Sequence, residues 1–170
     1  MTTADVFAKL AGHMIKGLMV HDQLANYYDF LGLDGFRREH RKHYDEESAC
    51  YHELCHYYTR HYNMLVASEK VEDPKIIPQT WYKYLRTDVD VNTRRNGVEN
   101  GFRQWRDWEA TTLHTYEQFY KELFNLGEVA ACHYLEKLIE DVNSELEYID
   151  EMILKLKATD YDAVYICELQ

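Results

Sequence analysis

Hydrophobic side chains recur along this chain at alternating steps of four and three, the spacing that places residues on one face of an α-helix. The first such segment covers residues 4–31, with Leu10, Met14, Gly17, His21, Leu24, Tyr28 and Leu31 on its face. The second covers residues 36–66, with Phe36, His40, His43, Glu47, Tyr51, Leu54, Tyr58, His61 and Leu65. The sequence between them, Gly32-Leu33-Asp34-Gly35, is typical of a helix end and a turn. So short a link predicts that these two helices are antiparallel neighbours.

The same periodicity predicts a second pair of helices, over residues 98–125 and 127–157. The face of the third helix carries Phe102, Trp105, Glu109, Thr112, Tyr116, Phe119 and Leu123. The face of the fourth carries Ala131, Leu135, Leu138, Val142, Glu145, Ile149, Met152 and Leu156. Gly127 marks the turn between them, and residues 161–170 are predicted to form a short C-terminal helix.

Residues 68–96 lack a clear period and contain both prolines of the chain, which indicates an irregular or partly helical connection. This segment is long enough to cross the full length of a bundle. Two hairpins joined in this way have the connectivity of bundles with one long crossover. The sequence therefore predicts an all-α, antiparallel four-helix bundle, with the crossover between its second and third helices, and a single domain over residues 1–170.

Composition narrows the possible partners. The chain has 19 Lys and Arg against 30 Asp and Glu, a formal net charge of −11, which disfavours binding to nucleic acid or to an anionic membrane. No apolar run approaches the roughly 20 residues of a membrane span, and the N-terminus lacks the pattern of a signal peptide. We therefore expect a cytoplasmic protein whose four cysteines, Cys50, Cys55, Cys132 and Cys167, are reduced thiols.

Four ionisable residues fall on faces that should be apolar, one on each predicted helix: His21, Glu47, Glu109 and Glu145. A buried carboxylate is costly unless it is paired or bound to a cation. His21 and Glu47 lie equally far before and after the first turn, and Glu109 and Glu145 equally far before and after the second. If the crossover returns the chain to the end where the first turn lies, all four side chains meet in one layer.

A four-helix bundle with such a layer resembles the ferritin-like family of carboxylate-bridged di-iron proteins, in which inward Glu and His side chains from four helices hold two metal ions. The resemblance implies that the ligands are Glu47, Glu109, Glu145 with Asp141 one turn earlier, and His21 in place of the family's first-helix glutamate. The family's Glu-x-x-His pattern does not occur at Glu47, which is followed three residues later by Cys50.

A second possible layer lies deeper in the bundle and includes a true Glu-x-x-His pattern. It consists of His13, Glu53, His56, Glu117, His133 and Glu136. Glu53 and His56 flank the apolar face of their helix, which favours a position at the surface. His52-Glu53-Leu54-Cys55-His56 also matches the zinc-peptidase pattern His-Glu-x-x-His, although a helical bundle lacks the cleft that binds a peptide substrate.

Two functions are compatible with these features. The first is a metal-binding ferritin-like protein that holds one or two ions of iron or manganese at His21, Glu47, Glu109 and Glu145, with oxygen-linked redox or metal-handling activity. The second is a metal-free bundle that acts as an interaction or assembly module. The sequence indicates no catalytic residue or substrate in either case. Its aromatic content favours a homo-oligomer, most simply a dimer.

Overall fold

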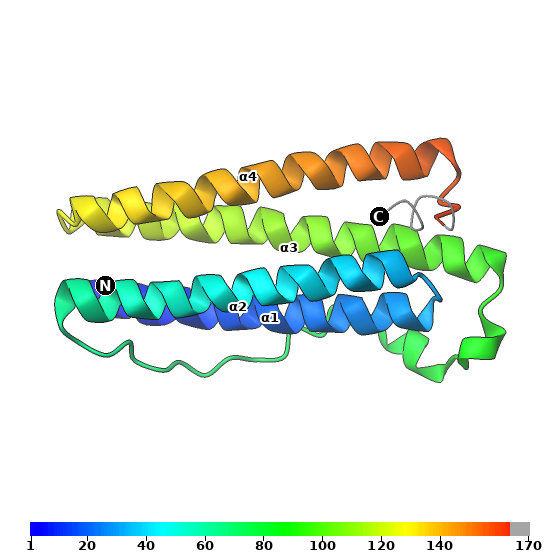
Figure 1. Ribbon diagram of the computed structural model, residues 1–170, viewed down its shortest axis with the longest axis horizontal. Coiled ribbons are helices and arrows are strands. Elements are labelled where there is room, and N and C mark those ends of the chain that lie inside the picture. Colours follow the sequence, from blue (N-terminus) through cyan, green and yellow to red (C-terminus); the bar gives the residue numbers. More distant parts are fainter. Residues whose placement is uncertain (164–170) are drawn as a thin grey trace.

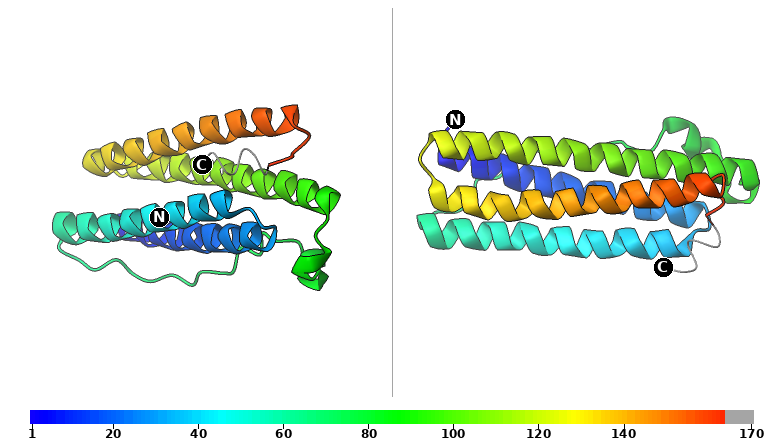
Figure 2. Two further views of the ribbon diagram at one scale, coloured as in Figure 1. Left: turned by 45° about the vertical axis from the view of Figure 1, so that its right-hand side comes forward. Right: turned by 90° about the horizontal axis from the view of Figure 1, so that it is seen from above.

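The computed structural model describes residues 1–163, which form four long α-helices. These are α1 (Thr3–Phe30), α2 (Asp34–Tyr62), α3 (Val91–Asn125) and α4 (Val129–Ala158). Helices α1 and α2 form one antiparallel hairpin, α3 and α4 form another, and the two hairpins pack as two layers (Figures 1 and 2). The predicted all-α four-helix bundle with one long crossover is thereby confirmed. None of the helices in the described part of the chain is long and apolar enough to cross a bilayer.

Both hairpins turn through the same local structure. Gly32 and Gly127 follow the ends of α1 and α3 with φ angles of 74° and 77°, a conformation that glycine adopts without steric cost. In the first turn the Leu33 N–H donates to the Tyr28 carbonyl at 2.9 Å, and the second turn repeats this bond at 3.0 Å. These bonds define Schellman motifs, which satisfy the last carbonyls of a helix. The predicted helix ends at these two glycines are confirmed.

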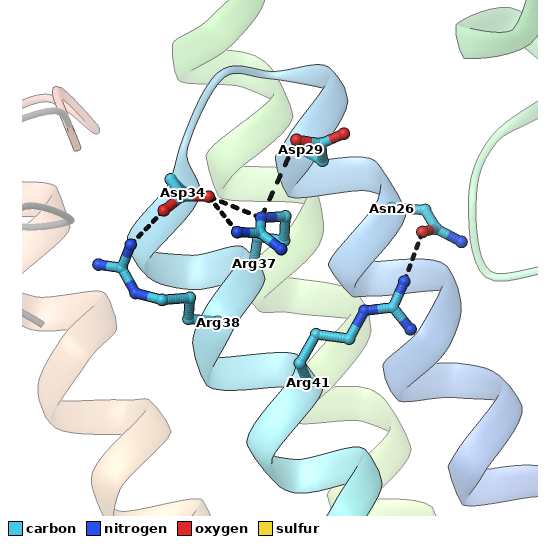
Figure 3. A network of polar contacts seen from close by, with 6 residues as sticks. All are labelled: Asn26, Asp29, Asp34, Arg37, Arg38 and Arg41. Atoms are coloured by element: carbon cyan, nitrogen blue, oxygen red, sulfur yellow. Dashed lines mark hydrogen bonds and ion pairs between the residues drawn. The ribbon is translucent and has the colours of Figure 1, made fainter.

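A polar network holds the first turns of α2 against α1 (Figure 3). Asp34 accepts a hydrogen bond from Arg37 Nε at 2.6 Å and another from Arg38. Arg41 Nη2 donates to Asn26 Oδ1 of α1 at 2.9 Å. Exposed pairs of this kind contribute at most about 1 kcal/mol each. Their main consequence is that Arg37, Arg38 and Arg41, all near the start of α2, have partners within the chain.

The crossover runs back along α1 as an extended segment followed by two short 3₁₀ helices, η1 (Gln79–Lys83) and η2 (Arg86–Asp88) (Figure 1). Gln23 of α1 fixes its path, because Gln23 Nε2 donates to Asp73 at 2.6 Å and Gln23 Oε1 accepts from the Ile76 N–H at 3.1 Å. The partly helical connection predicted from the sequence is therefore confirmed, and it returns the chain to the end of the bundle where α2 began.

Several boundaries differ from the prediction. Helix α2 ends before residue 66 because Asn63 takes a left-handed conformation with φ of 54°. Helix α3 begins well before residue 98 because the Asp90 side chain caps it, accepting from the Thr93 N–H at 2.7 Å. After α4, Asp160 and Tyr161 have φ angles of 51° and 58° and start a turn. The rest of the predicted C-terminal helix, 164–170, lies outside the described residues.

The core consists of two hydrophobic clusters at opposite ends of the bundle. One is built around Val20, Phe36, Trp105, Ile149 and their neighbours. The other is built around Phe7, Leu54, Tyr116, Leu135 and their neighbours. Along α2, α3 and α4, the residues between the two clusters are mainly polar. The hydrophobic core is therefore divided at about half the length of the bundle.

Helices α1 and α3 approach each other closely at two glycines of α3. A Cβ on Gly101 would lie 2.5 Å from the Tyr28 hydroxyl oxygen, and one on Gly97 would lie 2.9 Å from the Leu31 methyl groups. Real Cβ atoms do not come this close to neighbouring heavy atoms. The separation of these helices therefore depends on the absence of side chains at both positions.

We predict that Gly101→Ala destabilises the protein by about 1–3 kcal/mol, because the strain of overpacking exceeds the gain in helix propensity. Gly12→Ala is the matched control, since a Cβ there meets Glu69 Cβ at an ordinary 3.6 Å. That variant should gain about 0.5–1 kcal/mol. Urea unfolding monitored by circular dichroism measures both changes. Equal stabilisation by the two substitutions would contradict the close packing at Gly101.

Candidate metal centre

A layer of ionisable side chains lies between the two hydrophobic clusters. Every helix contributes to it: the members are His21 of α1, His40, His43 and Glu47 of α2, Glu109 of α3 and Glu145 of α4. His21 is 1% exposed and Glu109 is 3% exposed, so the centre of the layer is shielded from solvent. Helical periodicity puts these residues on inward faces because each occurs on the same stripe as core residues of its own helix.

Three carboxylates of this layer, those of Glu47, Glu109 and Glu145, line one cavity of about 270 Å³. It lies between α2 and α4, with α3 contributing Glu109 and Tyr116. The remaining lining residues are His43, Glu46, Cys50, Leu138, Asp141 and Val142. The backbones of α2 and α4 stay farther apart than those of the closely packed pairs α1–α2, α3–α4 and α1–α3. The cavity occupies this wider gap.

The structure brings the four sequence-predicted residues to one level but not to one point. His21 Nε2 lies 3.8 Å from Glu109 Oε1, although His21 is not among the residues that line the cavity. Glu47 extends toward α1, where its Oε2 would be 3.4 Å from a Cβ on Gly17. Among residues 1–163, no three His, Cys, Asp or Glu side chains are grouped closely enough to hold a metal ion in their present positions. Metal binding at this layer therefore stays a prediction.

Among residues 1–163, these carboxylates form no ion pair with Lys or Arg, and their basic neighbours are the imidazoles of His21 and His43. Burial, followed by the proximity of Glu145 and Glu47, raises the pKa of Glu109 well above its usual value, and the Trp105 indole opposes part of this rise. Burial likewise raises the pKa of Glu47 and of Glu145 to about 7. Burial lowers the pKa of His21 to about 3, so that its imidazole is neutral at pH 7. The buried Oε1 atoms of Glu109 and Glu145 accept no hydrogen bond in the described structure.

Two histidines of the layer were not singled out by the sequence analysis. His40 is fully buried, and its Nδ1 lies 3.1 Å from His21 Nδ1, so that one ring donates and the other accepts. His43 Nδ1 lies 3.2 Å from Glu145 Oε1, and His43 also lines the cavity. Both occur on the same helical stripe as Glu47, which is the signal that could have identified them. The predicted layer included only Glu47 from that stripe.

The second predicted layer does not assemble in the described structure. Glu53, His56, Glu117 and Glu136 are all exposed. This confirms the surface position expected for the Glu-x-x-His pair. His133, also exposed, lies 3.1 Å from Glu136 of its own helix. The two histidines of the zinc-peptidase pattern, His52 and His56, are exposed on α2 and belong to no group of potential metal ligands among residues 1–163.

His13, the remaining member of that second layer, is a packing residue. Its ring stacks on Trp108 with centroids 4.7 Å apart, and its Nε2 lies 2.9 Å from Thr112 Oγ1. Burial, with a smaller contribution from Lys16, lowers the pKa of His13 to about 4. The neutral imidazole is therefore the form that the folded protein accommodates.

We predict that His13 makes stability depend on pH below neutrality. Because its folded pKa lies below the usual 6.5, its contribution is complete above pH 6.5 and is lost as the pH falls toward 4. The loss amounts to about 3 kcal/mol. Urea unfolding of the wild type and of His13→Gln from pH 7 to pH 4 measures it, and the stability difference between them should shrink by that amount. A difference that is constant with pH would contradict the burial of a neutral His13.

No known protein family and no curated protein sequence matches this chain. Solved structures do match, among them crystals of PmFTN variants soaked in iron. A Glu→His variant soaked for 45 min gives a TM-score of 0.79 at 10% identity, covering 98% of this chain and 97% of that one. A Glu→Gln variant soaked for 45 min gives 0.77 at 11% identity, covering 98% and 94%. A Glu→Ala variant soaked for 5 min gives 0.74 at 10% identity, covering 91% and 88%. The chain therefore has the ferritin-like four-helix-bundle fold.

Proposed function

We propose that this chain is a ferritin-like metal-binding protein whose buried carboxylate layer binds one or two divalent ions, iron in the first place and manganese in the second. The observation that carries the proposal is the group of Glu47, Glu109 and Glu145 around one cavity whose lining contains no Lys or Arg. The iron-soaked crystals of the PmFTN variants, which share the fold, support iron as the ion to test first.

The residues present suit such an ion. Carboxylate oxygens and imidazole nitrogens are ligands that ferrous and manganous ions accept. Glu109 is 3% exposed, and its Oε1 has no hydrogen-bond partner, which is costly for a carboxylate unless a cation offsets it. We propose Glu47, Glu109, Glu145 and His43 as the ligands, with His21 beside Glu109 as a fifth candidate. The cavity of about 270 Å³ leaves these side chains room to rotate toward a cation.

The protein itself would contribute two properties to the metal site, which are partial enclosure from water and negative charge. Leu138, Val142 and Tyr116 form the apolar part of the cavity wall and limit its contact with water. Burial raises the pKa of the three carboxyl groups, so a cation that binds would displace their protons, and the resulting carboxylates would supply the negative charge that holds it. A bound ferrous ion would add one-electron exchange with oxygen, and we propose metal handling linked to that exchange as the activity. No organic substrate is part of this proposal.

We predict that Glu109→Gln abolishes stoichiometric metal binding, because it removes the most deeply buried carboxylate of the layer and keeps its shape. Glu117→Gln is the matched control, an exposed glutamate on the same helix. Protein purified without chelator is loaded anaerobically with ferrous or manganous ion, freed of excess metal and analysed by plasma mass spectrometry. Wild type and Glu117→Gln should retain the metal.

The same variants test the metal-free alternative. If the layer has no ligand, the wild type retains no metal after loading, and Glu109→Gln is neutral or stabilising in thermal unfolding because it removes an uncompensated buried acid. That combination of results would contradict the metal-binding proposal. It would favour the bundle as an interaction module.

A further inference from the structure

We propose that metal ions reach the carboxylate layer directly from solvent through an opening between α2 and α4, where Glu46 and Asp141 take them up. This inference rests on the proposed metal-binding function of the layer and adds a route to it. Glu46 belongs to α2 and Asp141 to α4, and both line the same cavity as Glu47, Glu109 and Glu145. We call Glu46 and Asp141 the mouth residues. The family resemblance grouped Asp141 with the ligand Glu145, but its side chain is exposed, and this proposal therefore assigns Asp141 to capture and not to the ligand set.

The acidic side chains that line the cavity range from buried to exposed. Glu109 is 3% exposed, Glu145 is 24% exposed and Glu46 is 53% exposed. Asp141 is also exposed. A single cavity that contains both fully buried and solvent-exposed carboxylates connects the buried layer to the surface. The buried, unpartnered Oε1 of Glu109 marks its inner end.

The charge of the lining suits a cation along this whole length. Of the ten residues that line the cavity, five are Asp or Glu and none is Lys or Arg. Lys42 lies outside the lining, with its Nζ 3.4 Å from Glu46 Oε1. His43 connects the mouth to the interior, because its Nδ1 lies 3.4 Å from Glu46 Oε2 and 3.2 Å from Glu145 Oε1. Potential ligands therefore follow one another at short distances from the surface inward.

The packing of the bundle disfavours other routes. Helix α1 packs closely on both α2 and α3, and it contributes no residue to the cavity lining. Along the bundle axis, the two hydrophobic clusters lie on either side of the layer, and a hydrated ion would lose its water there without gaining ligands. The gap between α2 and α4 is therefore the path on which an ion moving from solvent to the layer passes polar side chains.

Acidic residues at a mouth raise the local concentration of cations and hence their association rate, an effect that salt screens. We expect the double variant Glu46→Gln, Asp141→Asn to take up metal about three- to tenfold more slowly at low ionic strength. The difference should shrink at high salt. The final metal content should equal that of the wild type, because the mouth residues capture the ion and do not hold it.

The uptake rate is measurable by stopped-flow mixing with ferrous ion under anaerobic conditions. Quenching of tryptophan fluorescence reports arrival, because the Trp105 ring lies 5.1 Å from that of His43. The matched control is Glu53→Gln, Glu140→Gln, which removes the same charge from exposed positions on the same two helices. The control should take up metal at the wild-type rate.

The outcomes separate the route from the site. Equal rates for the mouth and control variants, with full metal content in both, would overturn the route and leave the metal site standing. Loss of bound metal from the mouth variant at equilibrium would make a mouth residue a ligand and would also overturn the assignment. Absence of metal from the loaded wild type would overturn both proposals.

Discussion

Carboxyl groups held close together inside the bundle, around a cavity whose lining contains no Lys or Arg, are the constraint on which the rest of this structure depends. Glu47, Glu109 and Glu145 line one cavity at about half the length of the helices. The layer divides what would be a continuous core into two hydrophobic clusters. Burying charge in such a place is unfavourable. The two clusters must therefore supply enough apolar burial to hold the layer together.

The spacing of the helices follows from what lies between them. Where α1 meets α3, Gly97 and Gly101 allow Tyr28 and Leu31 to approach the α3 backbone directly. Where α2 meets α4, long polar side chains span the gap, including His43 to Glu145 at 3.2 Å and the Tyr148 hydroxyl, which donates to Glu39. One face of the bundle is consequently tight and the other contains a polar cavity. That asymmetry places the cavity of the buried layer on the side of the bundle where α2 faces α4.

The fold is shared with the PmFTN variants at about one identical residue in ten, so the bundle architecture tolerates a nearly complete change of sequence. The layer of this chain contains three imidazoles besides its carboxylates. His21, His40 and His43 lie together, and the Trp105 ring makes edge contacts with all three. Burial keeps them neutral by lowering their pKa values, so they add nitrogen atoms to the layer without adding positive charge.

The sequence by itself determined the four helices, the two tight turns and the common level of His21, Glu47, Glu109 and Glu145. These features follow from local signals: the helical period, glycines that end helices, and equal counts of residues from each turn. It did not reveal the capped start of α3 at Asp90, the roles of His40 and His43, or the burial of His13 against Trp108. Nor did it reveal that the layer opens between α2 and α4. Those features depend on how far each helix rotates and how closely its neighbour approaches, which only contacts between residues distant in the chain decide.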